Sequence, residues 1–567
     1  MWKYFSTLIL LVLVILVIGF VRNNYYRNIN NPLHTDLQLA ANFGELRPDH
    51  FHMGLDIRTN GKENLPVYAI EEGYISLVKI ELDGYGKAIF LDHPDGKTSV
   101  YAHLNRFNDS LEAFVRRQQY ATKAWQQEIT CPSAAFPVKR GELIGYSGNT
   151  GRSEGPHLHF ELRDTRTGKN LNPALYGYSV TDHTAPVIQG LYWYDRRYST
   201  YERGPTPIAL MGEKGDYRSK KQIVKVSSPV VSLGIRADDR VDDSRFRYGI
   251  YRAQVWLDDL LIHEFALNNF SGSESRYVNA CIDYSNSVRS GLVIQHLSRL
   301  PGNLLPVYKG GDGLIHLKDT LQHRVHIRIS DVAGNDTDLR FVLKHSNYDP
   351  VEHDLAPVAR MLKPGQSHVV INEHVEAQFD KNAFYDIVPF ALQVQKDNRK
   401  DAASALIRLH KPIVPVHSRY LVKIKTRLKP GDPLRRKSVI QLAGFKHKTV
   451  IKGVWDGNYL QGRFDELGTV QVLIDTIAPV VELSGSNDGI TLPEDARSIS
   501  ISVKDNLSEA FLLSAELDGR WVLFEQKGSV FTHFFDENCK TGKHILKIIV
   551  SDVAGNVTST RYKFVKQ

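Results

Sequence analysis

Two short segments of this chain recur far apart in the sequence. The segment Asp182-His183-Thr184-Ala185-Pro186-Val187-Ile188 returns as Asp475-Thr476-Ile477-Ala478-Pro479-Val480-Val481, and the D-V-A-G-N of residues 331–335 returns at residues 552–556. Alternating apolar and polar residues precede the D-V-A-G-N, which is typical of a half-buried strand. Repeated short strands separated by turn residues predict β-sandwich modules. The fold class is therefore expected to be mainly β.

The repeats also divide the chain. With 567 residues it is too long for one hydrophobic core. We expect β-sandwich modules over residues 181–347 and 476–567, and a further β domain over 348–475, where strand-like pieces contain proline. A separate N-terminal domain is expected over residues 31–180.

The chain begins with a membrane-targeting pattern. Met1-Trp2-Lys3 is followed by an apolar run from Tyr4 to Val21 and then by Arg22. The run has just the length needed to span a bilayer and lacks a clear small-x-small cleavage site. Residues 1–30 are expected to be a membrane anchor or a signal segment, with the uncleaved anchor preferred. Either alternative places the rest of the chain outside the cytoplasm.

Charge and cysteine content give weaker information. The net charge is +8 and the isoelectric point is about 9.0, but no block of lysine and arginine stands out. A solvated surface explains this small excess, and no nucleic-acid partner is predicted. The cysteines, Cys131, Cys281 and Cys539, are few and widely separated, which argues against a disulfide framework.

The N-terminal domain shows strand signals with one exception. Short β-rich runs lie between residues 67 and 101, and Pro94-Asp95-Gly96 predicts a tight turn that places His103 just beyond a hairpin strand. Residues 108–130 instead carry apolar residues near helical spacing, with Pro132 after them. We expect a compact antiparallel β-sheet domain with a helical insertion beside the sheet or over a cleft.

Two H-x-H triplets stand in this domain, His50-Phe51-His52 and His157-Leu158-His159. The 22 histidines of the chain would form about one such triplet by chance, so the triplet alone is a weak signal. In a strand, however, both imidazoles of a triplet lie on one face. Asp56 follows His52 by four residues and adds a carboxylate. Two histidines and one carboxylate leave a coordination position open on zinc, as catalytic sites require.

Three motifs occur in an order that is specific to one protein family. They are H-x-x-x-D at 52–56, Y-x-H-L at 101–104, and the run from Gly148 to Glu161 that reads G-N-T-G-R-S-E-G-P-H-L-H-F-E. In these motifs the chain resembles the lysostaphin-like, or LytM-type, zinc endopeptidases of bacterial cell walls. The resemblance covers about residues 43–164. The later repeats resemble bacterial immunoglobulin-like modules that begin with A-P-V and end near D-x-A-G-N.

The resemblance implies roles for individual residues. His52, Asp56 and His159 would bind one zinc ion, and His157 and His103 would be the catalytic pair, with His157 as the preferred general base. Glu161 lies two residues after His159 and could orient that ring, or be an ordinary strand residue. His50 imitates the second triplet but lies outside the H-x-x-x-D motif.

One departure from the family pattern concerns the oxyanion. Some relatives place a tyrosine shortly before the first ligand, whereas here that neighbourhood holds Phe43, Leu46, Arg47 and Phe51. Stabilisation of the oxyanion would then depend on histidine alone.

Three functions are compatible with these patterns. The first is a zinc metalloendopeptidase of the bacterial envelope that hydrolyses peptide bonds in peptidoglycan, held at the membrane by residues 1–30. The second is a non-catalytic envelope scaffold, or an activator of cell-wall hydrolases, that keeps its metal site. The third is an adhesin-like protein in which the β modules carry the function. The complete set of ligand and catalytic positions favours the peptidase.

Overall fold

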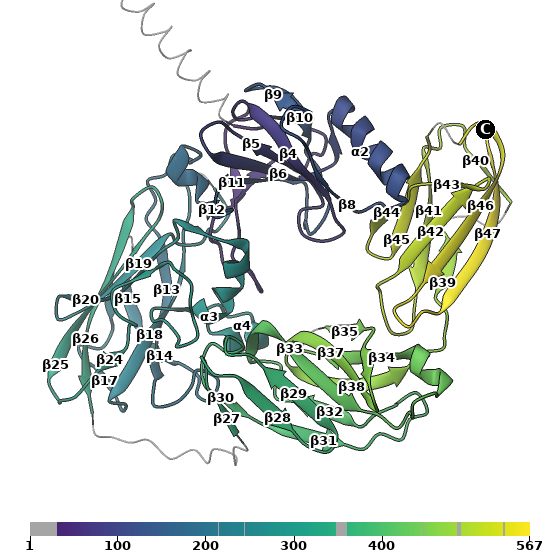
Figure 1. The fold of residues 1–567 in the computed structure, drawn as a ribbon. Helices are drawn as coiled ribbons and strands as arrows, with labels where there is room; N and C mark the ends of the chain where they lie inside the picture. Colours follow the sequence, from purple (N-terminus) through teal and green to yellow (C-terminus); the bar gives the residue numbers. More distant parts are fainter. Residues whose placement is uncertain are drawn as a thin grey trace, which may run out of the picture.

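The computed structural model describes residues 31–213, 215–242, 244–346, 360–445, 447–484, 489–536 and 539–567. Strands predominate, as the sequence indicates, and they group into four lobes that follow one another around a ring (Figure 1). We name them by their elements: the first lobe runs from β1 to η1, the second from β13 to β26, the third from β27 to β38 and the fourth from β39 to β47.

The first lobe is built on one antiparallel sheet. Its strands, in spatial order, are β1 (Leu39–Ala41), β2 (Leu55–Arg58), β11 (His157–Asp164), β6 (Lys97–Leu104), β5 (Lys87–Asp92), β4 (Gly73–Ile80) and β8 (Gln127–Thr130). A smaller sheet contains β3 (Pro66–Tyr68), β10 (Leu143–Tyr146) and β7 (Arg106–Phe107). The central strands β5, β6 and β11 are almost continuously buried, so both faces of this sheet are covered.

Helix α2 (Asp109–Thr122) lies within the segment for which the sequence predicts a helical insertion. The Asn108 side chain caps its start by accepting from the backbone N–H of Leu111, and Lys123 ends it in a left-handed conformation. Leu111 and Val115, four residues apart, bury the same face of the helix. The helix stands at the side of the sheet and not over it (Figure 1).

The second lobe contains two packed sheets. One has β14 (Thr206–Ile208), β13 (Val187–Asp195), β18 (Val230–Asp238) and β22 (Gln295–His296); the other includes β16 (Asp216–Ser219), β26 (Asp336–His345), β25 (Gln322–Ser330), β19 (Arg252–Leu257) and β20 (Leu260–Ala266). A helical segment interrupts the strands with η2 (Gly272–Tyr277), α3 (Val278–Cys281) and α4 (Tyr284–Ser290).

The first two lobes share one hydrophobic core. A single cluster of buried side chains extends from Leu33 in the first lobe to Leu343 in the second. β12 (Asn170–Leu171) of the first lobe pairs with β21 (Asn269–Phe270) of the second, and the Phe270 ring packs 4.7 Å from that of Phe43. Because this interface is apolar and hydrogen-bonded, it has the character of a domain interior, which favours a fixed arrangement of the two lobes.

The third and fourth lobes have cores of their own. The third contains β28 (His368–Ile371), β29 (Val375–Phe379), β33 (Pro415–Lys425), β37 (Tyr459–Glu466) and β36 (Val454–Asp456) in one sheet, and β31 (Leu392–Gln395), β32 (Leu406–Leu409), β38 (Gly468–Ile474), β34 (Ser438–Ala443) and β35 (Lys448–Ile451) in the other. The fourth contains β39 (Val480–Leu483), β41 (Ser498–Lys504), β45 (Val530–Phe534) and β44 (Glu525–Lys527), packed on β40 (Ile490–Leu492), β47 (Val557–Lys566), β46 (Gly542–Ser551), β42 (Leu512–Leu517) and β43 (Arg520–Trp521).

The expected membrane segment, residues 1–30, lies outside the described residues. Among the helices of the described part of the chain, none combines the length and the apolar character that crossing a bilayer requires.

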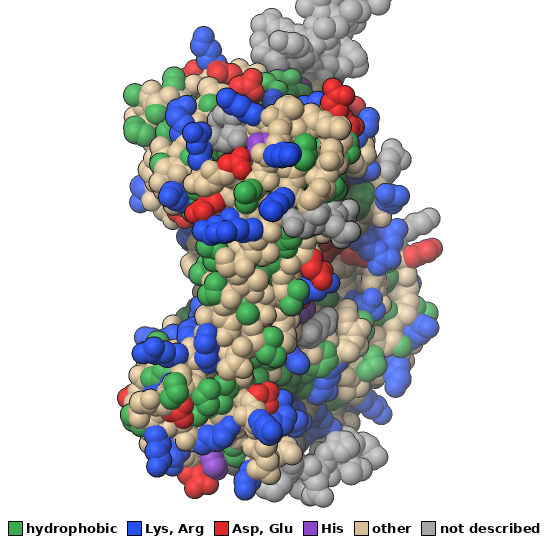
Figure 2. Space-filling model, turned by 90° about the vertical axis from the view of Figure 1, so that its right-hand side faces the viewer, with side chains coloured by type: hydrophobic (Ala, Val, Ile, Leu, Met, Phe, Trp, Pro, Cys, Tyr) green, Lys and Arg blue, Asp and Glu red, His purple; other side chains and the backbone are tan. Residues whose placement is uncertain are grey.

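Basic charge is dispersed over the face of the molecule that Figure 2 presents. Lysine and arginine side chains stand there among acidic and hydrophobic ones, over the upper and the lower part of the view. Dispersed charge of this kind stays hydrated and creates no strong local field.

The fourth lobe returns to the first and closes the ring. Asp536 accepts hydrogen bonds from Tyr120 and Arg116 of α2, the second at 3.4 Å, and the Trp521 ring meets that of Tyr120 edge-on at 5.2 Å. Lys87 of β5 donates to Glu525 at 3.1 Å. Tyr120 and Asp536 are 416 residues apart in the sequence. Their contact therefore joins two distant regions of the chain.

We predict that this contact can be opened without unfolding a lobe. An edge-on aromatic pair contributes about 0.5–1.5 kcal/mol and a hydrogen bond to a charged group about 1.5–3 kcal/mol. The double variant Tyr120→Ala/Trp521→Ala should open the ring and increase the radius of gyration in small-angle X-ray scattering. Tyr120→Phe, which keeps the ring contact, should have a smaller effect. An unchanged scattering curve for the double variant would contradict the prediction.

Candidate functional site

Two neighbouring strands, β2 and β11, and the turn before β2 bring the predicted metal-binding residues together. In the antiparallel register His159 of β11 stands opposite Asp56 of β2 on one side and Ala102 of β6 on the other. His52 reaches the same place from the turn before β2. That turn passes so close to β11 that a Cβ atom on Gly54 would lie 2.2 Å from the carbonyl oxygen of Phe160, so only glycine fits there.

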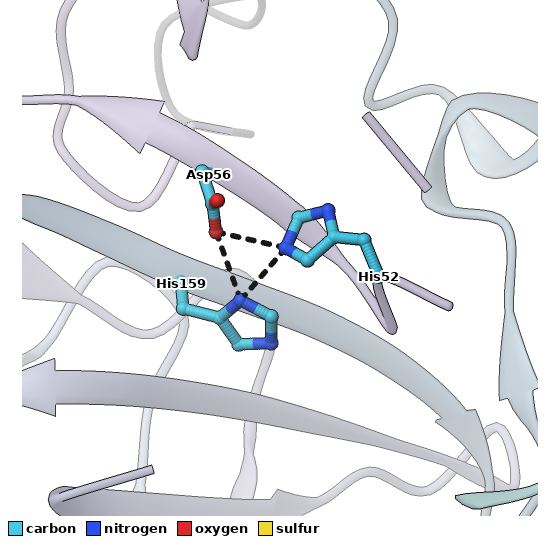
Figure 3. A group of neighbouring side chains, drawn as sticks. All are labelled: His52, Asp56 and His159. Atoms are coloured by element: carbon cyan, nitrogen blue, oxygen red, sulfur yellow. Dashed lines mark hydrogen bonds and ion pairs between the residues drawn. The ribbon is translucent and has the colours of Figure 1, made fainter. Parts of the chain in front are cut away.

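The donor atoms of the three residues form a tight triangle (Figure 3). His52 Nε2 lies 2.9 Å from Asp56 Oδ1 and 3.1 Å from His159 Nδ1, and His159 Nδ1 lies 2.9 Å from the same Asp56 oxygen. All three residues are buried. The structure thus brings together His52, Asp56 and His159, the three residues that the resemblance implies as ligands.

The hydrogen bonds of the outer ring nitrogens of His52 and His159 determine that the inner nitrogens carry lone pairs. His52 Nδ1 lies 2.7 Å from the backbone carbonyl of Asn42, and His159 Nε2 lies 3.0 Å from the Glu161 carboxylate. These oxygens only accept, so both outer nitrogens carry hydrogen. In their neutral forms His52 Nε2 and His159 Nδ1 then direct lone pairs at each other and at a carboxylate. That arrangement is repulsive unless a cation lies between them, so these residues fit a metal ion.

The charge state of the triangle follows from its neighbours. Burial alone would raise the pKa of Asp56, but the adjacent His52, His157 and His159 hold it well below its usual range. Burial lowers the pKa of His52. Burial would also lower that of His159, but hydrogen bonds to Asp56 and Glu161 raise it to about 9. Without a metal, a proton on His159 therefore occupies the position that a cation would take.

Glu161 orients His159. Its side chain is fully buried and accepts hydrogen bonds from His159, from the Tyr85 hydroxyl at 2.9 Å, from Arg163 at 2.6 Å and from Asn170 at 2.7 Å. Burial would raise its pKa, but Arg163 and His159 lower it to about 2. The carboxylate is thus ionised and fixed, and of the two alternatives that the sequence leaves open, the orienting role is the one its contacts support.

The second oxygen of Asp56 is held separately. Arg47 donates to Asp56 Oδ2 at 3.1 Å and lies 3.3 Å from Glu45. Burial raises the pKa of Glu45 to about 7. Arg47 therefore turns Asp56 so that Oδ1 faces the two imidazoles.

His103 and His157 lie side by side next to the triangle, with ring centroids 4.7 Å apart. His157 Nε2 is 3.4 Å from Asp56 Oδ1. Nδ1 of His157 lies 2.8 Å from the Gly155 carbonyl, and Nδ1 of His103 lies 2.8 Å from that of Thr150. A carbonyl oxygen only accepts, so each neutral ring carries its hydrogen on Nδ1 and has a free lone pair on Nε2. Both imidazoles can therefore accept a proton.

His103 is held in a strained backbone conformation. It is the penultimate residue of β6, where the sequence predicts a position just beyond the strand, and its φ of 59° lies in the left-handed region. For a residue other than glycine this conformation costs about 1–2 kcal/mol, and such costs are common at functional sites. Burial, together with His159 and His157, lowers the pKa of His103 to about 3, so the ring is neutral at pH 7.

His50 does not join this group. Its Nδ1 contacts the Asp49 carboxylate at 2.6 Å, and Asp49 also forms an ion pair with Arg152 at 3.0 Å. The side chains of His50 and His52 thus have different partners, because residues 50–52 do not form a regular strand that would place both rings on one face.

Several residues of the site have no clear signal in the sequence. Tyr85 comes from the turn between β4 and β5, Arg47 precedes the first motif, and Asn170 follows β11. Only Arg163 could have been found, because it lies two residues after Glu161 and so on the same face of the strand. The polar groups that fix the ligands come from segments that meet only in the folded sheet.

Two segments of the chain match known families. Residues 50–132 and 133–173 match Peptidase family M23, and residues 359–475 match the Zu5-like domain. Together, the two ranges of the Peptidase family M23 match contain all the residues of the triangle and both additional imidazoles.

Curated relatives and solved structures are similar to a domain-sized part of the chain. The DD-carboxypeptidase/endopeptidase Mpg of Neisseria gonorrhoeae is 34% identical over 122 residues, which are 22% of this chain and 22% of that protein. The cell division protein DipM of Caulobacter vibrioides is 30% identical over 148 residues, 25% of this chain and 20% of that protein. The chain thus spans about a fifth of the length of these relatives. The catalytic domain of lysostaphin from Staphylococcus simulans is 25% identical, with a TM-score of 0.19, over 25% of this chain and 93% of that domain.

We predict that Glu161→Gln weakens metal binding while the sheet stays folded. Glutamine has nearly the same shape but removes the charge that holds the hydrogen of His159 on Nε2. Loss of such a partner lowers metal affinity about 10–100-fold. Competition with a chromophoric chelator for cobalt or zinc measures this change. Glu128→Gln, which alters an exposed carboxylate paired with Lys79 in the same lobe, is the matched control and should bind like the wild type. Equal affinity of Glu161→Gln and wild type would refute the orienting role.

Proposed function

Residues 50–173 of this chain form a domain of the LytM-type Peptidase family M23, and from this premise we propose that the protein is a zinc-dependent endopeptidase that hydrolyses peptide bonds in peptidoglycan. The observation that carries the proposal is the convergence of three metal-donor atoms with two further imidazoles beside them. The stem peptides and cross-links of the wall are the proposed substrates.

Zinc is the metal that we assign to the triangle. Imidazole nitrogens and one carboxylate suit zinc, and three protein ligands leave one position open, as in catalytic sites. His52, Asp56 and His159 would hold the ion. When bound, zinc would supply Lewis-acid activation of a water molecule and of the peptide carbonyl at neutral pH.

The remaining chemistry is assigned to the two imidazoles. His157 Nε2, which carries a lone pair and adjoins the triangle, is the proposed general base that accepts the proton of the attacking water. His103, whose ring lies beside that of His157, is the proposed partner: its Nε2 would receive the proton that His157 takes from the water, donate it to the developing oxyanion and release it to the leaving amine. The low pKa of His103 means that it holds a transferred proton only briefly, which suits a group that must release it again.

The location we propose is the bacterial cell envelope. The substrate lies outside the cytoplasm, and the N-terminal apolar segment would hold the chain at the membrane. The later lobes would then place the site at a distance from the membrane or contact envelope proteins.

A second candidate function is an envelope scaffold or hydrolase activator. The closed ring favours this function, because it brings the fourth lobe close to the candidate site. Glu525 of the fourth lobe accepts a hydrogen bond from Lys87 of β5. Lys87 pairs with Leu104 of β6, which directly follows His103. In that case the metal would stabilise the first lobe and no bond would be cleaved.

We predict that His157→Ala separates the two functions. Loss of a general base reduces the rate about 10²–10⁴-fold, while the three ligands remain. Purified chain and peptidoglycan are incubated with zinc, and new free amines are measured. His50→Ala removes the equivalent histidine of the other triplet and should retain wild-type activity. Removal of metal with a chelator should abolish activity, and zinc should restore it.

Two outcomes would contradict the peptidase. Equal release of amines by wild type and His157→Ala would remove the base from the mechanism. No release by wild type, in a preparation that binds one zinc ion per first lobe, would support the scaffold instead.

A further inference from the structure

A group of three carboxylates lies where the first lobe passes into the second. Asp182 belongs to the connecting segment, Asp239 directly follows β18, and Asp331 directly follows β25. One carboxylate oxygen from each lies within 4.8 Å of the others. Asp331 opens the D-V-A-G-N motif and Asp182 opens the segment that contains A-P-V, so two of the three members belong to repeated motifs that the peptidase site does not use.

The D-V-A-G-N turn fixes two members of the group. Asp331 Oδ1 accepts the backbone N–H groups of Gly334 at 2.7 Å and Asn335 at 2.9 Å. The Asn335 side chain donates to Asp331 Oδ2 at 2.7 Å and to the backbone carbonyl of Asp182 at 3.3 Å. The motif therefore ties the connecting segment to the turn and holds the two carboxylates close together.

Asp239 is the unexplained member. It is only 4% exposed, and its Oδ1 has no hydrogen-bond partner. Among the described residues no lysine, arginine or histidine forms an ion pair with Asp182, Asp239 or Asp331. Burial, with Asp331 and Asp182 close by, raises the pKa of Asp239 to about 8. A buried carboxylate without a partner is costly unless something positive compensates it.

There is also space at this position. A cavity of about 40 Å³ is lined by Asp182 and Asp239, by Leu39 and Asn42 of the first lobe, and by Val332 next to Asp331. A cavity of this size holds an ion or a water molecule, and its lining comes from both lobes.

We propose that Asp182, Asp239 and Asp331 bind a calcium ion at the junction of the first two lobes. Oxygen-only donors select hard cations, and calcium accepts irregular sets of carboxylates, carbonyls and waters more readily than magnesium does. The ion supplies the positive charge that the three carboxylates lack. This site is separate from the peptidase centre and does not depend on the proposed hydrolytic function.

The same construction recurs at the junction of the third and fourth lobes. Asp475, Asp505 and Asp552 again place their oxygens within 4.8 Å of one another, and Asp505 Oδ1 has no hydrogen-bond partner. Asn556 donates to Asp552 at 2.8 Å and to the carbonyl of Asp475 at 3.1 Å, as Asn335 does in the first group.

One neighbour distinguishes the second group. Lys452 donates to the carbonyl of Ala554 at 3.0 Å, and its charge acts on Asp475 and Asp552. A fixed ammonium group already compensates part of the negative charge, so the second group should bind calcium more weakly than the first.

Calcium at the first junction would set the direction in which the second lobe leaves the peptidase domain. Asp182 lies four residues after Tyr178, which packs against Phe160 of the first lobe. The helical segment of the second lobe reaches the active-site turn, where Phe51 N–H donates to the Ser275 carbonyl at 3.2 Å. The ion would therefore stabilise the contact that borders the peptidase site.

Calorimetric titration of calcium into the full chain tests the proposal. The protein is first stripped of metal and reloaded with one equivalent of zinc, so that the histidine site is filled. The variant Asp505→Asn serves as background, because only the first group can then bind with full charge. We expect one calcium ion to bind with a dissociation constant of about 10⁻⁴–10⁻³ M or below, and magnesium to bind more weakly.

Asp239→Asn in this background should weaken calcium binding at least about tenfold and abolish the rise in melting temperature that calcium causes. Asp216→Asn, at an exposed position of the same lobe, should change neither. Asparagine has the shape of Asp239 and removes its repulsion by Asp182 and Asp331, so the variant should fold. If it does not fold, Asp182→Asn takes its place in the same comparison. No calcium binding up to 10 mM, or equal binding by the Asp239→Asn protein, would overturn the proposal.

Discussion

The hydrogen bond between Glu161 and His159 is the interaction on which the proposed centre depends. It fixes which nitrogen of His159 carries hydrogen, and therefore which one is free to bind a metal. Glu161 can do this only because Arg163, Tyr85 and Asn170 compensate its burial. Without that set of donors the carboxylate would take up a proton, and the ligand nitrogen would lose its direction.

The register of β2, β11 and β6 has a comparable effect on the proposed catalytic pair, His157 and His103. A shift of one residue would turn His157 and His159 to the opposite face of β11. The same register places His103 at the end of β6, where its unusual φ turns the ring towards His157. The strain is tolerated because the surrounding strands are buried and fully paired, so that the cost is small against the stability of the sheet.

The sequence singles out the three residues of the triangle but few of the residues that support them, for a physical reason. His52, Asp56 and His159 lie in short motifs that resemble those of the zinc endopeptidases, so the resemblance is enough to single them out as ligand candidates. Tyr85 and Arg47 act through tertiary contacts and leave no local trace. The β character of the later lobes also follows from alternation, as does the helix at residues 109–122 from its spacing. The return of the fourth lobe to α2 could not be predicted, because it depends on the summed angles of three junctions.

The two kinds of proposed metal site use different chemistry and should not exchange ions. The histidine site offers two nitrogens and one carboxylate, which is a poor set for calcium because imidazole is too soft a ligand. The junction sites offer only oxygen, and zinc gains little there compared with the histidine site. The separation has a structural consequence, because a loss of calcium would loosen the junctions and leave the zinc ligands in place, while a loss of zinc would leave the lobes in their arrangement. Among the described residues no basic side chain pairs with the first junction group, and Lys452 balances only part of the charge in the second, whereas in the first lobe arginine and histidine balance it. A chain that needed these acidic residues only for turns would have had no reason to bury Asp239 beside two others.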